Sequence, residues 1–183
     1  MKRTILKFGL ISAAIISALM WATVPFQHKI GFDRALFVGY TTMVLAFLLV
    51  FFGIRSYRDN EGHGQITFAR AFGVGISITL ITCIFYVVSW EIIYFNFMHN
   101  FMDDYTALMV AKAKASGMSA AALQAQVESL RIAKERYENI FYNCAMTFIE
   151  PFPVGFVITL ISAAVLRKRR PTQEIAAQVV ATS

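Results

Sequence analysis

The sequence predicts an all-α membrane protein with four transmembrane helices and an extracytoplasmic helical hairpin between the third and fourth helices. The chain has 183 residues, of which 57% are hydrophobic and 15% are charged. Soluble globular domains are about 45–50% apolar and about 25% charged. The apolar excess excludes a soluble domain and a disordered chain. With only two cysteines, a disulfide-stabilised scaffold is excluded as well.

Four apolar segments are long enough to cross a bilayer. A transmembrane helix needs about 20 mainly apolar residues to cross about 30 Å of hydrocarbon. The expected spans are residues 4–24, 35–54, 71–90 and 146–166. The first span also resembles a secretory signal peptide. Met20 and Trp21 stand where a cleavage site needs small residues, so we expect this helix to be retained.

The basic residues predict the orientation of the spans. Lysine and arginine concentrate on the cytoplasmic side of membrane proteins. One side would carry ten of them: Lys2, Arg3, Lys7, Arg55, Arg58, Arg70, Arg167, Lys168, Arg169 and Arg170. The other side would carry Lys29, Arg34 and a charge-balanced segment. We therefore expect both termini and the tail 167–183 to be cytoplasmic, with the basic run meeting anionic lipid headgroups rather than nucleic acid.

The polar segment before the fourth span predicts the outer hairpin, at about residues 98–141. Residues 103–115 are rich in helix-forming residues, and Ser116-Gly117 would end that helix. Ser119 is a predicted N-cap for a second helix that runs to about Glu138. An apolar stripe on the second helix needs a partner, for which the other arm, a second subunit and the lipid surface remain alternatives. Its members are Leu123, Val127, Leu130, Tyr137 and Phe141.

Glu150 is the main candidate for a functional residue, because a carboxylate inside a span is costly. Pro151 and Pro153 follow it and predict a helix kink with free carbonyl groups beside the carboxylate. Glu91, at the outer end of the third span, is the second candidate carboxylate. The two could share a proton or a cation. Alternatively, Glu150 forms a structural ion pair with Arg34.

Other signals of chemistry are weak. The sequence contains no nucleophile elbow, phosphate-binding loop or metal-ligand motif, so we expect no catalytic residues, metal or cofactor. Small residues recur every fourth position in three spans and predict close helix packing within the chain or in a homodimer. Residues 67–82 also resemble residues 147–162, which is compatible with an inverted repeat of the kind found in transporters.

One loop resembles a known family. Tyr57-Arg58-Asp59-Asn60, followed by a segment that includes Arg70, is similar to the loop signature of the family called domain of unknown function 4199. The motif at Glu150 and the residues after it resemble the last span of that family. The resemblance implies a four-helix protein of the bacterial cytoplasmic (inner) membrane with no assigned activity.

Two functions are compatible with these features. The first is a non-enzymatic accessory or structural membrane component, which acts through helix packing and the outer hairpin on an unidentified membrane-protein partner or a second copy. The alternative is a small ion- or proton-coupled transporter or channel subunit that uses Glu150 and Glu91.

Overall fold

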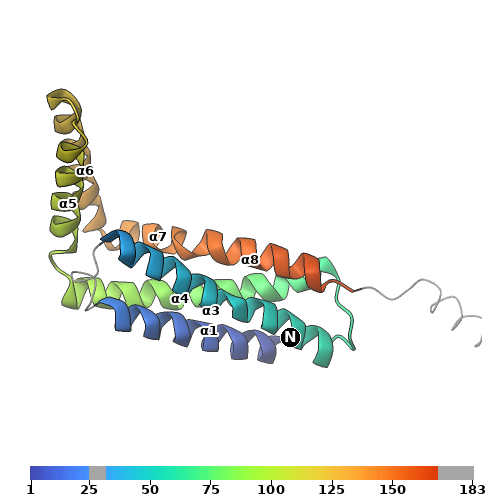
Figure 1. Ribbon diagram of the computed structural model, residues 1–183. Coiled ribbons are helices and arrows are strands. Elements are labelled where there is room, and N and C mark those ends of the chain that lie inside the picture. The colour runs from blue at the N-terminus through green and yellow to red at the C-terminus, as the bar shows by residue number, and fades with distance from the viewer. Residues whose placement is uncertain (25–31, 169–183) are drawn as a thin grey trace, which may run out of the picture. The chain divides into compact units, whose positions relative to one another are not determined.

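The computed structural model describes residues 1–24 and 32–168, with the backbone alone for residues 32 and 33. These residues are helical almost throughout (Figure 1), and their one β pairing is an isolated antiparallel bridge between Ile66 and Lys168. The helices are α1 (Lys2–Thr23), α3 (Phe32–Asn60), α4 (Phe68–Phe97), α5 (Phe101–Ala115), α6 (Ala120–Tyr137), α7 (Ile140–Ile149) and α8 (Pro151–Leu166). Lys29 and residues 169–183 of the predicted tail lie outside the described residues.

The chain forms two compact units. The first comprises residues 1–86 together with the chain from Glu150 onward, and the second is Val87–Ile149. The first therefore holds α1, α3, most of α4 and all of α8. The second holds the end of α4 with α5, α6 and α7.

Within the described ranges, four helical segments are long and apolar enough to cross a membrane, as predicted: Lys2–Thr23, Arg34–Asn60, Phe68–Phe97 and Ile140–Leu166. The protein is thus a multi-pass membrane protein by the length and composition of its helices. The helices extend beyond the predicted spans. The second helix continues to Asn60 and the third to Phe97, and the fourth segment begins at Ile140 rather than at residue 146.

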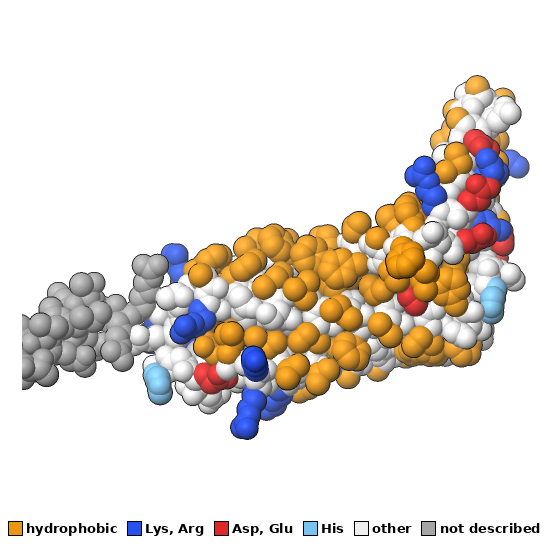
Figure 2. All heavy atoms as spheres, turned by 180° about the vertical axis from the view of Figure 1, so that it is seen from behind, with side chains coloured by type: hydrophobic (Ala, Val, Ile, Leu, Met, Phe, Trp, Pro, Cys, Tyr) orange, Lys and Arg blue, Asp and Glu red, His pale blue; other side chains and the backbone are white. Residues whose placement is uncertain are grey.

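The first unit has small and polar side chains in its interior, and large apolar side chains cover its outside as well as filling its inside. The interior includes Ser12 and Thr79 beside Phe47 and Ile54, whereas Phe37 is 75% exposed. Figure 2 shows hydrophobic side chains over the helices of this unit. Such a distribution suits a lipid environment, where helices associate by close packing rather than by the hydrophobic effect.

Contacts at one end of the first unit bring together the N-terminus, the loop 61–67 and the end of α8. The amino group of Met1 and the hydroxyl of Thr4 both contact the Glu61 carboxylate. Ile66 and Lys168 exchange two backbone hydrogen bonds of 3.0 and 2.9 Å. These three parts of the chain therefore lie on the same side of the unit.

In the second unit, α5 and α6 pack against each other across a tight turn (Figure 1). The helix ends match the sequence prediction closely. Gly117 adopts the left-handed conformation (φ 72°) that ends α5. The Ser119 side chain caps α6 by accepting a hydrogen bond of 3.3 Å from the Ala122 amide. Of the predicted apolar stripe on α6, Leu130 is buried, whereas Val127 is 42% exposed.

Candidate functional site

Glu150 stands where the fourth membrane-crossing segment is interrupted. α7 ends at Ile149, and α8 begins with Pro151 at its first position. Pro151 and Pro153 have no amide hydrogen to donate, so the backbone carbonyl groups one turn earlier lose their usual partners. The helix is therefore interrupted at the residue that precedes the prolines, where the kink is predicted.

The partner of Glu150 is a tyrosine, not an arginine. The Tyr86 hydroxyl donates a hydrogen bond of 2.9 Å to Glu150 Oε2 inside the first unit. Arg34 is exposed, and no ion pair between it and Glu150 exists among the described side chains. The proposed Glu150–Arg34 pair is thus not formed in this structure. Tyr86 was missed by the sequence reasoning, although a tyrosine deep in the third span is a polar group that would need a partner.

Glu91 lies in the second unit, on the last turns of α4. Both of its carboxylate oxygens are shielded from solvent, and neither finds a hydrogen-bond partner of good geometry within the described residues. The Cys144 thiol of α7 is the polar group beside them. Because Glu91 and Glu150 belong to different compact units, each carboxylate is considered by itself.

α4 and α8 meet through two equivalent contacts. Gly75 of α4 packs against Thr159 of α8, and Gly155 of α8 packs against Thr79 of α4. Between them, the Thr79 and Thr159 hydroxyls form a hydrogen bond of 2.9 Å. The order of these contacts makes the two helices antiparallel, and the reciprocal pattern is that of a two-fold related pair.

This contact gives the similarity between residues 67–82 and 147–162 a structural counterpart. In that alignment Gly75 matches Gly155 and Thr79 matches Thr159, which are the residues that exchange contacts. The spacing is close: a Cβ added to Gly155 would lie 2.5 Å from Thr79 Cγ2 and 2.7 Å from Phe47 Cε1. The small-residue stripes of these spans are therefore used for packing within the chain.

The loop signature lies mostly in helix. Tyr57, Arg58, Asp59 and Asn60 form the last turn of α3, and Arg70 is in the first turn of α4. Residues 61–67 connect α3 to α4. Two residues of this signature contact each other: Arg58 Nε donates a hydrogen bond of 2.7 Å to Asp59 Oδ1. Tyr57 is buried, and its carbonyl oxygen accepts the amides of Glu61 and Gly62 at 2.9 and 3.0 Å.

The charges of α6 are paired along the helix surface. Arg131 donates to both Glu128 oxygens, at 3.0 and 2.7 Å, and also contacts Glu135. The hydrogen bond from Arg131 lowers the pKa of Glu128, and the same bond raises the pKa of Arg131. Lys134 reaches across to Asp103 of α5, and this contact raises the pKa of Lys134. A helix pair with its charges matched in this way suits an aqueous surface.

Comparison with known proteins gives one match. The model of the family described as "Protein of unknown function (DUF4199)" matches residues 7–168. No curated protein and no solved structure gives a significant match. The matched range covers three of the four membrane-crossing segments in full, the first segment from residue 7 onward, and the loop signature. The chain therefore belongs to the DUF4199 family.

Proposed function

We propose that this protein is a non-enzymatic component of the bacterial cytoplasmic membrane, which acts through helix packing and through the α5–α6 pair at the outer surface. The main observation in support of this proposal is that charged side chains of α5 and α6 form ion pairs at the surface. Lys134 with Asp103, and Arg131 with Glu128, are exposed ion pairs. They are stable in water and costly in hydrocarbon, which supports a place outside the bilayer.

The arrangement of the basic residues supports cytoplasmic termini. The N-terminus, the loop 61–67 and Lys168 share one end of the first unit, and Figure 2 shows lysine and arginine side chains at that end. Exposed basic residues there are Lys2, Arg3, Lys7, Arg55, Arg70 and Arg167. Positive charge of this kind holds a helix end on the cytoplasmic side.

Cysteine labelling in intact cells tests the orientation. A cysteine introduced at Ser129, on the exposed surface of α6, should react with a membrane-impermeant maleimide before the cells are permeabilised. A cysteine introduced at His63, in the loop 61–67, should react only afterwards. The two variants are built on a Cys83→Ser, Cys144→Ser background so that only one thiol is present. The reverse order of labelling would refute the proposal.

Site-specific photo-crosslinking tests the accessory role. The apolar residues Met118 and Val127 are 41% and 42% exposed on the α5–α6 pair and are the positions from which we expect a discrete adduct with another protein or a second copy. A crosslinker at Ser129, an exposed polar position on the same helix about 200° around the helix axis from Val127, is the matched control. Equal adducts from all three positions, or none, would count against an accessory role.

The hydrogen bond between Tyr86 and Glu150 favours a second candidate function, a proton- or cation-coupled transporter or channel subunit. Ionisable residues in membrane spans are rare and commonly mark proton or ion pathways. The test is ion or proton flux into liposomes that contain the purified protein. Flux that Glu150→Gln abolishes, and that Glu135→Gln on the surface of α6 leaves unchanged, would support this function. Absence of flux from the unmodified protein would exclude it.

A further inference from the structure

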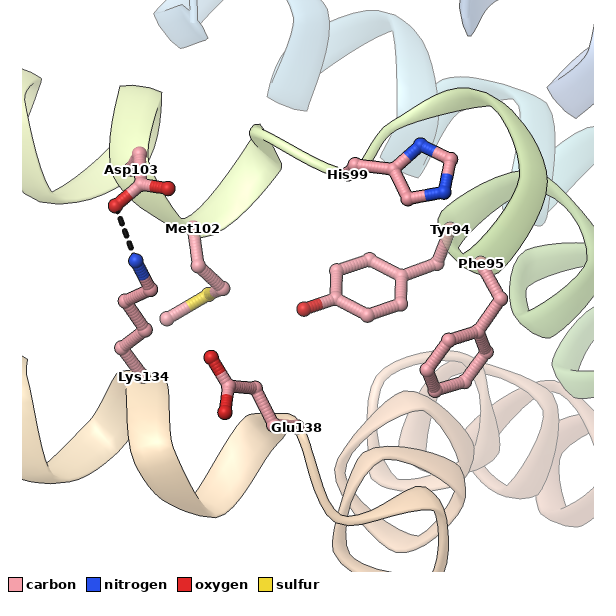
Figure 3. Close-up of a pocket in the computed structure, with 7 residues that line it drawn as sticks. All are labelled: Tyr94, Phe95, His99, Met102, Asp103, Lys134 and Glu138. Atoms are coloured by element: carbon pink, nitrogen blue, oxygen red, sulfur yellow. Dashed lines mark hydrogen bonds and ion pairs between the residues drawn. The ribbon is translucent and has the colours of Figure 1, made fainter.

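The second unit contains a cavity of about 270 Å³ where the end of α4 meets α5 and α6. Figure 3 shows the side chains that line it: Tyr94, Phe95, His99, Met102, Asp103, Lys134 and Glu138. Pockets for drug-sized ligands are about 300–1,000 Å³, so this cavity suits a smaller molecule. Neither of the proposed functions assigns a role to it.

One of the two carboxylates that line the cavity has no cationic partner among the described side chains. Lys134 pairs with Asp103 (Figure 3), which cancels both charges. Glu138 makes no ion pair to any side chain that the structure describes. Its carboxylate points into the same space in Figure 3. The aspartate, glutamate and lysine side chains of the lining therefore carry one net negative charge.

Tyr94 supplies a hydrogen-bonding group at the wall of the cavity. Only 6% of this residue is exposed, and its hydroxyl makes no hydrogen bond within the described parts of the chain. The hydroxyl oxygen is not among the polar atoms that are shielded from solvent, so it is open to the cavity. The ring is held by edge contacts with Phe95 and Tyr137, at centroid distances of 5.0 and 5.3 Å. These contacts direct the unpartnered hydroxyl into the cavity (Figure 3).

A net negative, aromatic cavity of this size selects for positive charge. Aromatic faces attract ammonium groups through the ring quadrupole, and a carboxylate supplies the counter-ion. A metal ion is a poorer match, because no three His, Cys, Asp or Glu side chains among those described are grouped as metal ligands. We propose that the cavity binds a small organic monocation with an ammonium head, with Glu138 as counter-ion and the Tyr94 hydroxyl as a hydrogen-bond partner.

Calorimetric titration of the full-length protein in a non-ionic detergent tests this proposal, with choline as the probe. The control ligand is 3,3-dimethylbutan-1-ol, which has the same shape with carbon in place of the charged nitrogen. We expect choline to bind with one-to-one stoichiometry and the neutral analogue to give no binding at the same concentrations. Equal binding of the two ligands, or no binding of choline, would overturn the proposal.

Two variants assign the binding to this cavity. Glu138→Gln should weaken choline binding about fivefold, the ratio expected for a partly exposed ion pair. Tyr94→Phe should weaken it about threefold through the lost hydrogen bond. Glu135→Gln is the matched control, because it removes the same charge from α6 but lies outside the lining. If Glu138→Gln binds choline as Glu135→Gln does, the cavity is not the site. Because Glu138 and Glu135 are both exposed, both variants should fold.

Discussion

Replacement of Gly155 by alanine should destabilise the first unit, because this glycine is the point of closest approach between α8 and α4. The new Cβ would lie 2.5 Å from Thr79 Cγ2 and 2.7 Å from Phe47 Cε1, distances that side chains do not tolerate without movement. Gly73 is the matched control. It lies in α4, and a Cβ added there meets nothing within 4 Å.

The magnitude follows from two opposing effects. Alanine in place of glycine stabilises a helix interior by about 1 kcal/mol, and overpacking a filled interface costs about 1–3 kcal/mol. Gly73→Ala should therefore stabilise the protein by up to about 1 kcal/mol, because it has the first effect alone. The helix-propensity contribution cancels when the two variants are compared, so the difference between them should be about 1–3 kcal/mol.

Unfolding in sodium dodecyl sulfate, followed by circular dichroism in mixed micelles, measures the free energies of unfolding. A second substitution tests the proposed cause. Thr79→Ser removes the Cγ2 methyl group that the new Cβ would meet but keeps the hydroxyl that bonds to Thr159. Gly155→Ala should therefore be partly rescued in the Thr79→Ser background, because the close contact with Phe47 Cε1 remains. Equal stabilities of Gly73→Ala and Gly155→Ala, or no rescue, would refute the reasoning.

Three further predictions concern single contacts. Tyr86→Phe removes the donor to Glu150 and should lower the free energy of unfolding by about 1–3 kcal/mol in the same assay. Arg131 lowers the pKa of Glu128, so the ion pair should stabilise α6 at pH values above the unfolded pKa of about 4.3. This stabilisation should be lost as the pH falls through the pKa of Glu128 in the folded protein. Amide exchange in α6 should show this loss, and Arg131→Gln should remove it. Ser119→Ala should cost α6 about 1 kcal/mol of helix stability, measured as faster amide exchange in its first turn.

Each of these has an outcome that contradicts it. Tyr40→Phe, at an exposed position, is the control for Tyr86→Phe, and equal effects of the two would show that the hydrogen bond to Glu150 contributes nothing measurable. The unfolded pKa of a glutamate is about 4.3, so the pair should respond to a change from about pH 6 to about pH 3. An exchange profile of α6 that stays the same over this range would contradict the electrostatic argument. Unchanged exchange near Ser119 would show that its cap is not formed.

Local features of this protein were predictable because neighbouring residues determine them. The four apolar segments, the end of α5 at Ala115 and the cap at Ser119 all follow from residues within one or two helical turns. The helix that ends at Asn60 extends beyond the predicted span 35–54, since a hydropathy pattern records where apolar residues stop rather than where backbone hydrogen bonding stops.

Hydrophobicity and proline act within a single helix, so the sequence predicts that this chain crosses a membrane and which glutamate interrupts its last span. The three-dimensional structure was needed to find that Tyr86, rather than Arg34, meets Glu150, and that Gly75 and Gly155 exchange contacts with Thr159 and Thr79. Those contacts join residues more than 60 positions apart. In a bilayer such pairs depend on which helix faces come close enough to pack, and a pattern along one helix does not specify the face that its neighbour presents.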